Sequence, residues 1–287
     1  AGPTSTATNA GSVTVSVAGT TATVTYENSS GLTEAQTDNL INTLAYRHTS
    51  EDPAAGNRIV TLTSIQDSGG TADSGADTRA LSIASTVTVV STNDPPILSL
   101  NISGVYTEGD TTPLMPISGV NVSDIDAEHF NGGNIQIHQS TYVEGDRLQV
   151  VTGNEFALNG SLLEFNGTVI GAIDNTLNGQ SVGLKINFTS NLATDSVVAS
   201  LLQKIGYLTT NQNPTVSGSL PNRTLTVTLN DGGNESSEGG ARSTTTAAGS
   251  FSLVGINDIP TLTGLDSNHT IVYTQARDPV VIDADAV

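Results

Sequence analysis

The chain has 287 residues, of which 36% are hydrophobic but only 4% aromatic, with no Trp and no Cys. Its 28 Asp and Glu against 9 Lys and Arg give a formal net charge of -19, which argues against nucleic acid and against membrane insertion or an anionic membrane surface. Without cysteine, neither disulfides nor thiolate metal sites are available. No apolar run approaches the length of a membrane span. The length is typical of about two domains.

The first predicted elements lie in residues 32–70. Leu32 precedes a polar cluster and a short amphipathic stretch, for which we expect a helix over about residues 34–44. A polar loop with proline, an alternating strand and an Asp-x-Gly turn follow. The same order returns in residues 192–233. We therefore interpret residues 1–92 as the C-terminal part of a repeated unit.

The phrase Asn-Asp-x-Pro occurs at Asn93 and again at Asn257, one domain length later. We interpret it as the joint between units, so that residues 93–258 form one complete repeat. Residues 259–287 would then be the start of a third repeat, because 272–287 are similar to 105–120. The chain is expected to be a segment of a longer array of such repeats.

Within the complete repeat the hydrophobic pattern predicts strands almost throughout. They cover residues 96–102, 134–140, 147–151, 162–165, 168–173, 182–188, 223–230 and 249–256. Asn166-Gly167 lies between two of these strands and favours a type I′ hairpin. One helix interrupts them. Thr194 is expected to cap it and Asp195 to lie at its positive end, with apolar residues at helical spacing as far as Ile205.

Many short strands with a helix in one crossover predict an all-β fold. We expect tandem Ig-like or cadherin-like β-sandwiches with one short helix per repeat, arranged end to end. Tyr46 and Tyr207, which follow the two helices, are expected to be equivalent core residues.

The positions of the acids suggest a cation site. In a seven-strand sandwich the N-terminal linker and two loops share one end of the domain. That end would hold Asp94, Asp124, Asp126 and Asp231. Asp124 and Asp126 alternate, so in a strand both would point the same way. Like charges this close raise one another's pKa values unless a cation lies among them, and oxygen ligands are those that Ca²⁺ accepts.

Other acids are assigned by the same reasoning. Glu108 follows the first strand of the repeat, and we expect it at the opposite end, beside Asn257 and Asp258 of the next joint. In the first unit, Asp67 occupies the position of Asp231. The alternative is that the acids are solvated surface, which keeps a secreted protein soluble.

The order of these motifs resembles one repeat of the cadherin-like arrays in giant bacterial secreted adhesins, many of them of the RTX type. The resemblance runs from Tyr-Thr-Glu-Gly-Asp at 106–110 to Ile-Asn-Asp-Ile-Pro at 256–260, and the partial units extend it over almost the whole chain. In cadherins an early Glu, an Asp-x-Asp pair, a later Asp and an Asn-Asp linker chelate Ca²⁺ between domains. The resemblance implies these ligands in this chain: Asn93, Asp94, Glu108, Asp124, Asp126, Asp231, Asn257 and Asp258. The third copy departs from the pattern, with Gln275 in place of Glu108.

The resemblance implies calcium-stabilised extender repeats of a bacterial cell-surface adhesin, secreted or held at the cell surface. Their partners would be neighbouring repeats of the same chain, with a surface glycan or protein bound through other domains. A second interpretation is a carbohydrate- or other ligand-binding module, against which the scarcity of aromatic side chains argues. We expect no enzyme, because the sequence has no Gly-x-Ser-x-Gly elbow and its four His are scattered.

Overall fold

The structure is a computed structural model that describes residues 11–233, 244–260, 275 and 278. The chain divides into two compact units, unit 1 (Ala1–Thr92) and unit 2 (Asn93–Val287). Both units are built mainly of strands, as the composition predicts, so the chain belongs to the all-β class. The predicted start of a third repeat at 259–287 lies almost wholly outside the described residues. No helix in the described ranges is long and apolar enough to cross a membrane.

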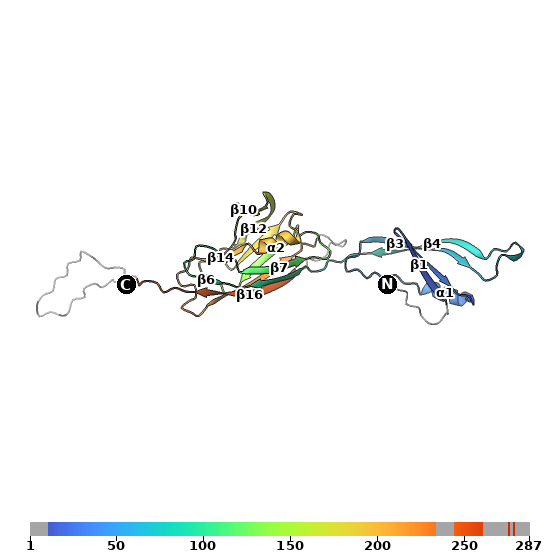
Figure 1. Ribbon diagram of the computed structural model, residues 1–287, viewed down its shortest axis with the longest axis horizontal. Helices are drawn as coiled ribbons and strands as arrows, with labels where there is room; N and C mark the ends of the chain where they lie inside the picture. Colours follow the sequence, from blue (N-terminus) through green and yellow to red (C-terminus); the bar gives the residue numbers. More distant parts are fainter. Residues whose placement is uncertain (1–10, 234–243, 261–274, 276–277, 279–287) are drawn as a thin grey trace. The chain divides into compact units, whose positions relative to one another are not determined.

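Unit 1 consists of two antiparallel hairpins, β1–β2 and β3–β4, with a helix between them (Figure 1). The bounds are β1 Ser12–Ala18, β2 Thr21–Glu27, α1 Glu34–Asn42, β3 Gly56–Gln66 and β4 Thr78–Val89, with a 3₁₀ turn at Ala72–Ser74. The predicted helix is confirmed. It begins with a capping box, in which Thr33 Oγ1 accepts from Gln36 N and Gln36 Oε1 accepts from Thr33 N.

Unit 1 has little core of its own. Among its described residues, Val89 is the one buried apolar side chain. Tyr46 remains 42% exposed, so the prediction that it is a core residue is wrong, whereas Tyr207 of unit 2 is fully buried. Leu44, Ile59 and Val60 are exposed as well.

Unit 2 is built on an eight-stranded sheet of order β10-β11-β12-β13-β8-β15-β16-β6. Neighbouring strands are antiparallel except β16 and β6, which are parallel. The pairs β5–β7 and β9–β14 form two further small sheets, and α2 packs against β7. The bounds are β5 Ile97–Ile102, β6 Val105–Thr107, β7 Ile117–Ser123, β8 Asn134–Gln139, β9 Asp146–Val150, β10 Phe156–Asn159, β11 Leu162–Phe165, β12 Thr168–Asn178, β13 Gly183–Phe188, α2 Asp195–Leu202, β14 Ile205–Thr209, β15 Asn222–Asn230 and β16 Thr244–Val254.

One hydrophobic core joins the large sheet to the small sheets and α2. The large sheet contributes alternating residues such as Ile135 and Ile137 of β8 and Val227 of β15, all at most 1% exposed. Across the core lie Leu148 of β9 and Leu201 of α2, among others. Strands that bury every second residue in this way are stabilised mainly by removal of apolar surface from water.

Local signals in unit 2 predicted most of its strands, although β6, β7, β10 and β14 were not predicted. Every predicted strand is present, and Asn166 (φ 50°) and Gly167 (φ 79°) form the expected tight turn between β11 and β12. The helix is one turn shorter than its pattern, because Ile205 opens β14 and pairs with Val150 of β9. Thr194 occupies the N-cap position, but its side chain makes no capping hydrogen bond.

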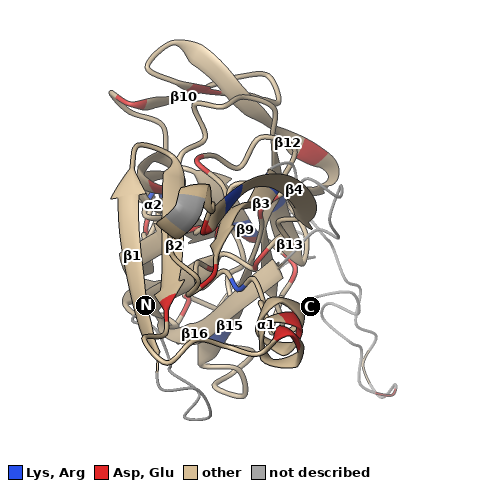
Figure 2. Ribbon diagram, turned by 90° about the vertical axis from the view of Figure 1, so that its right-hand side faces the viewer, with Lys and Arg blue, Asp and Glu red and all other residues tan. Residues whose placement is uncertain are grey.

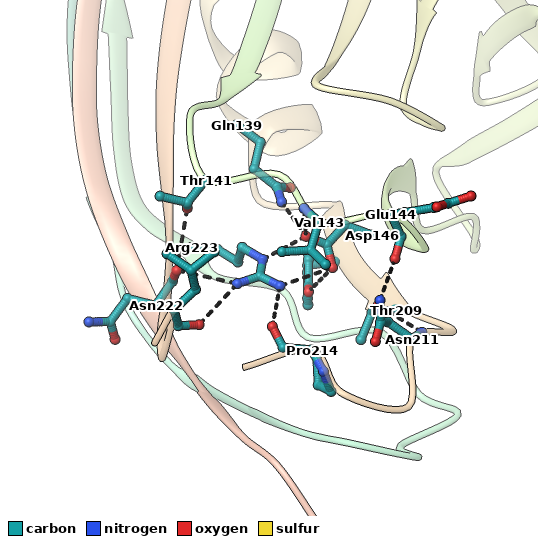
Figure 3. Close-up of polar contacts among 12 residues, drawn as sticks. Gln139, Thr141, Val143, Glu144, Asp146, Thr209, Asn211, Pro214, Asn222 and Arg223 are labelled. Atoms are coloured by element: carbon teal, nitrogen blue, oxygen red, sulfur yellow. Dashed lines mark hydrogen bonds and ion pairs between the residues drawn. The ribbon is translucent and has the colours of Figure 1, made fainter. Parts of the chain in front are cut away.

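A charged network is buried inside unit 2 (Figure 3). Arg223 Nε donates to Asp146 Oδ2 over 2.6 Å, and both side chains are fully buried. Tyr207 Oη donates to Asp146 Oδ1 over 2.6 Å, and Gln139 Nε2 donates to Asp146 Oδ2 over 2.7 Å. Arg223 Nη2 also donates to the carbonyl of Pro214 over 2.6 Å. Burial, and then the bond to Asp146, raise the pKa of Tyr207 well above its ordinary value, so the phenol remains a donor.

Candidate cation site at the linker of unit 2

The predicted Asp-x-Asp pair lies just after a strand, in the loop region expected for it. β7 ends at Ser123, and Asp124 and Asp126 occupy the bend after it. The condition under which alternation would aim both carboxylates the same way, that they lie in a strand, is therefore not met. They are brought together by the bend, in which Asp124 Oδ1 accepts from Asp126 N over 3.3 Å. Such Asx-type bonds are typical of Asp in turns.

The linker is tied to this bend and to a second acidic loop. Asn93 Nδ2 donates to Asp231 Oδ2 over 2.9 Å, and Asp94 N donates to Asp126 Oδ2 over 2.8 Å. Four sequence-predicted residues, Asn93, Asp94, Asp126 and Asp231, are thus directly connected, and Asp124 bonds to Asp126. All of them belong to unit 2.

The Asp-Gly-Gly loop has a backbone reason for its glycines. Asp231 is 2% exposed, and its Oδ1 accepts from Gly233 N over 2.9 Å. Gly232 (φ 91°) and Gly233 (φ 65°) both have left-handed backbone conformations that side chains disfavour. These conformations let the chain turn immediately after β15, which holds the Asp231 carboxylate next to the linker.

A further acid, which the sequence analysis had assigned only to the helix dipole, belongs to this cluster. Asp195, the first residue of α2, accepts a hydrogen bond from the backbone of Asp124, and burial raises the pKa of Asp195. The local sequence does not indicate this contact, because it depends on how α2 packs against β7. The cluster therefore joins four segments of unit 2: the linker, the bend after β7, the start of α2 and the loop after β15.

Burial and neighbouring charge act on the carboxylates of this cluster. Burial, a hydrogen bond to Asp126, and the charges of Asp126 and Asp231 raise the pKa of Asp124 to about 7. Asp124 Oδ2, Asp126 Oδ1 and Asp195 Oδ1 are buried and accept no hydrogen bond from the described residues. Among the residues that the structure describes, no Lys or Arg forms an ion pair with Asp124, Asp126 or Asp195. Buried oxygens of this kind are costly unless a donor or a cation satisfies them.

The donor set fits a hard cation better than a soft one. It offers carboxylate and amide oxygens, the ligands that Ca²⁺ takes in six- to eight-fold coordination. The geometry is not that of a finished site, because no group of three or more acidic or histidine side chains in the described ranges is arranged to hold a metal ion. The unsatisfied oxygens are therefore the observation that points to a cation. Acidic residues outnumber basic ones by 28 to 9 in the sequence, and Figure 2 marks both kinds on the described parts of the ribbon.

The second linker is found at the other end of unit 2, next to Glu108. This glutamate is 5% exposed; its Oε2 accepts from Ile256 N over 2.8 Å, and its Oε1 is buried with no partner in the described residues. Asn257 and Asp258 are exposed. Asn257 Nδ2 donates to the Asp258 carbonyl over 3.3 Å, the same bond at the same distance that Asn93 makes with Asp94. The two Asn-Asp phrases thus share this local hydrogen bond.

In the metal-free protein, the free energy of unfolding should fall as the pH rises from 5 to 8. Between its ordinary pKa of 3.8 and about 7, Asp124 keeps a proton when folded that it loses when unfolded. Stability falls with pH wherever the folded state binds more protons, so the contribution of Asp124 is lost as the pH rises through its folded pKa of about 7.

Thermal unfolding in EDTA at pH 5, 6, 7 and 8 tests this expectation. Asp124→Asn should flatten the pH dependence relative to the parent chain. Equal slopes for the parent and the variant would show that Asp124 ionises normally in the folded protein.

Among solved structures, the chain is similar to AggA, the major subunit of aggregative adherence fimbriae type I (AAF/I) from Escherichia coli. The alignment has 16% sequence identity, covers 58% of this chain and 99% of that chain, and reaches a TM-score of 0.26. A similarity this low carries no argument about function. No family model matches the chain, and no curated protein matches it significantly.

Proposed function

We propose that the chain is a structural segment of a bacterial surface or secreted adhesin, in which Ca²⁺ fixes the linkers between repeated β units. One observation carries the proposal. The Asn93-Asp94 linker is hydrogen-bonded to two acidic loops, and the cluster holds buried carboxylate oxygens that no described donor satisfies. The bacterial and adhesive part of the proposal rests on the sequence resemblance.

The residues that would hold the ion are Asn93, Asp94, Asp124, Asp126, Asp195 and Asp231. Bound Ca²⁺ would neutralise the carboxylates and supply the interactions that their oxygens lack. Without it, the carboxylates repel one another, which weakens the attachment of the linker to the loops. With it, residues 93 and 94 are held on unit 2, and the chain that leads into unit 2 loses freedom.

Glu108, Asn257 and Asp258 would form part of a second site of the same kind. Its remaining ligands would come from the repeat that we predict after residue 258. A series of such linkers would stiffen an array of units and hold a terminal binding module at a distance from the cell. The role is mechanical, and no catalysis is proposed.

Direct ion binding tests the proposal. Chelator-treated chain titrated with CaCl₂ in a calorimeter should bind Ca²⁺ and bind Mg²⁺ much more weakly, because Mg²⁺ is reluctant to shed its water. Asp195→Asn should lower the calcium affinity by about tenfold or more, by loss of one charged ligand.

Asp174→Asn is the matched control. It removes the same charge from a carboxylate that accepts hydrogen bonds from Thr176 and Leu177 of the same strand, β12. Absence of calcium binding, or equal affinities for the two variants, would contradict the proposed site.

A further inference from the structure

A polar hollow on the surface of unit 2 takes no part in the candidate cation site. Its volume is about 420 Å³, within the range of roughly 300–1,000 Å³ that is usual for small-molecule sites. Three segments line it: the turn before β9 with the start of that strand, the loop between β12 and β13, and the residues that follow β14.

Hydrogen bonds fix two of these segments against each other. Thr210 N donates to the Gly145 carbonyl over 3.1 Å. Asn211 Nδ2 donates to the Glu144 carbonyl over 2.7 Å (Figure 3). The turn before β9 and the residues after β14 therefore form one connected wall.

Two glycines allow the segments to approach this closely. Gly179 has a φ of 87°, and a Cβ there would collide with the carbonyl oxygen of Leu148 in β9. Leu148 N donates to the Gly179 carbonyl over 2.8 Å, which fixes the third segment. Gly145 has a φ of 97°, and its Cβ would lie 3.0 Å from Asn211 N. A ligand would thus meet walls that are already ordered, which lowers the entropic cost of binding.

Asp146 lies on the buried side of the hollow and is 1% exposed. Its carboxylate accepts hydrogen bonds from Arg223, Tyr207 and Gln139, and from the backbone of Val143. This buried network fixes the turn before β9 and leaves recognition of a ligand to the side chains around the hollow.

Five of those side chains are polar and make no hydrogen bond or ion pair with another residue of the described ranges: Tyr142, Glu144, Arg147, Gln180 and Thr210. They supply an acidic acceptor, a basic donor, an amide and two hydroxyl groups. The hollow therefore offers donors and acceptors together, and it offers one aromatic ring.

This combination favours one class of ligand. Glu144 opposes an anion, Arg147 opposes a cation, and the polar lining opposes an apolar molecule. Sugar hydroxyl groups both donate and accept hydrogen bonds, so they suit a site that holds a carboxylate, a guanidinium and an amide. The ring of Tyr142 provides an apolar surface for the C–H face of a sugar.

We propose that the polar hollow binds a neutral saccharide of one or two rings. Such a site would give unit 2 a recognition role in addition to the mechanical role proposed above. It uses none of the residues proposed to hold Ca²⁺, so it stands or falls independently of calcium binding.

A glycan array that carries neutral, sialylated and sulfated oligosaccharides is the first test, with the full chain applied in EDTA. We expect the chain to bind neutral glycans and not the sialylated or sulfated ones. The bound oligosaccharide, added as free sugar to ¹⁵N-labelled chain, should shift the amide resonances of residues 142–147, 180 and 210–211.

Matched variants complete the test. Arg147→Met should lower the affinity for that sugar about tenfold, through loss of a charged donor, and Gln180→Ala should lower it severalfold. Arg79→Met and Gln203→Ala, at exposed positions outside the hollow, should bind as the parent chain does. Gln180 is exposed in a loop, so its variant keeps the test valid even if Arg147→Met folds poorly.

Three results would overturn the proposal. The first is an array on which no neutral glycan is bound, and the second is a preference for charged glycans. The third is an affinity that neither Arg147→Met nor Gln180→Ala changes.

Discussion

Millimolar Ca²⁺ should raise the unfolding temperature of unit 2 by about 5–10 °C over the value in EDTA. A ligand that binds only the folded state stabilises it by about 2.7 kcal/mol at a hundredfold excess over its Kd, and 1 kcal/mol shifts the midpoint of a domain of this size by about 2–4 °C. Differential scanning calorimetry in EDTA, CaCl₂ and MgCl₂ measures the shift. We expect MgCl₂ to produce little of it.

The double variant Asp124→Asn with Asp126→Asn tests whether the stabilisation by calcium depends on these two carboxylates. In CaCl₂ the double variant should lose most of the stabilisation, because two charged ligands are gone. In EDTA it should be at least as stable as the parent chain, since it no longer holds two close carboxylates with unsatisfied oxygens. If Asp124 and Asp126 instead stabilised the metal-free fold, the double variant would be less stable than the parent chain in EDTA. Asp174→Asn should respond to calcium as the parent does.

The second large effect should come from the buried ion pair. Asp146→Ala or Arg223→Met leaves one charge without its partner in a fully buried environment, and each should lower the free energy of unfolding of unit 2 by about 3–5 kcal/mol. Chemical denaturation followed by circular dichroism measures this loss. Arg147→Met, the neighbouring but half-buried arginine of β9, should cost less than about 1 kcal/mol.

Combining the two changes separates the charge effect from lost packing. The double variant Asp146→Ala with Arg223→Met should be less destabilised than the sum of its single changes, because neither buried charge remains unpaired. Arg223 also bonds to the carbonyls of Pro214 and Leu220, so part of the loss should persist. Strictly additive effects would mean that the two side chains act independently.

The candidate site shows where sequence reasoning succeeds and where it stops. The order of the loops in a β-sandwich was enough to predict that Asp94, Asp126 and Asp231 lie at one end of unit 2. It could not include Asp195, because that contact depends on the packing of α2 against β7. The loop position of Asp124 and Asp126 was part of the prediction, but the hydrogen bond from Asp126 N to Asp124 Oδ1 within the bend was not, because it depends on the local backbone conformation.

The elements that depend on residues close together in the chain could be predicted from the sequence. Apolar alternation set the strands, the positive-φ residues Asn166 and Gly167 set a hairpin, and the capping box set the start of α1, because each depends on residues close together in the chain. Tertiary structure alone decided that Ile205 becomes a strand residue and that Asp146 meets Arg223. Tyr46 and Tyr207 make the same point, since they follow similar helices but differ completely in burial. A side chain's environment is set by which distant strand pairs beside it, and one short stretch of sequence does not specify that partner.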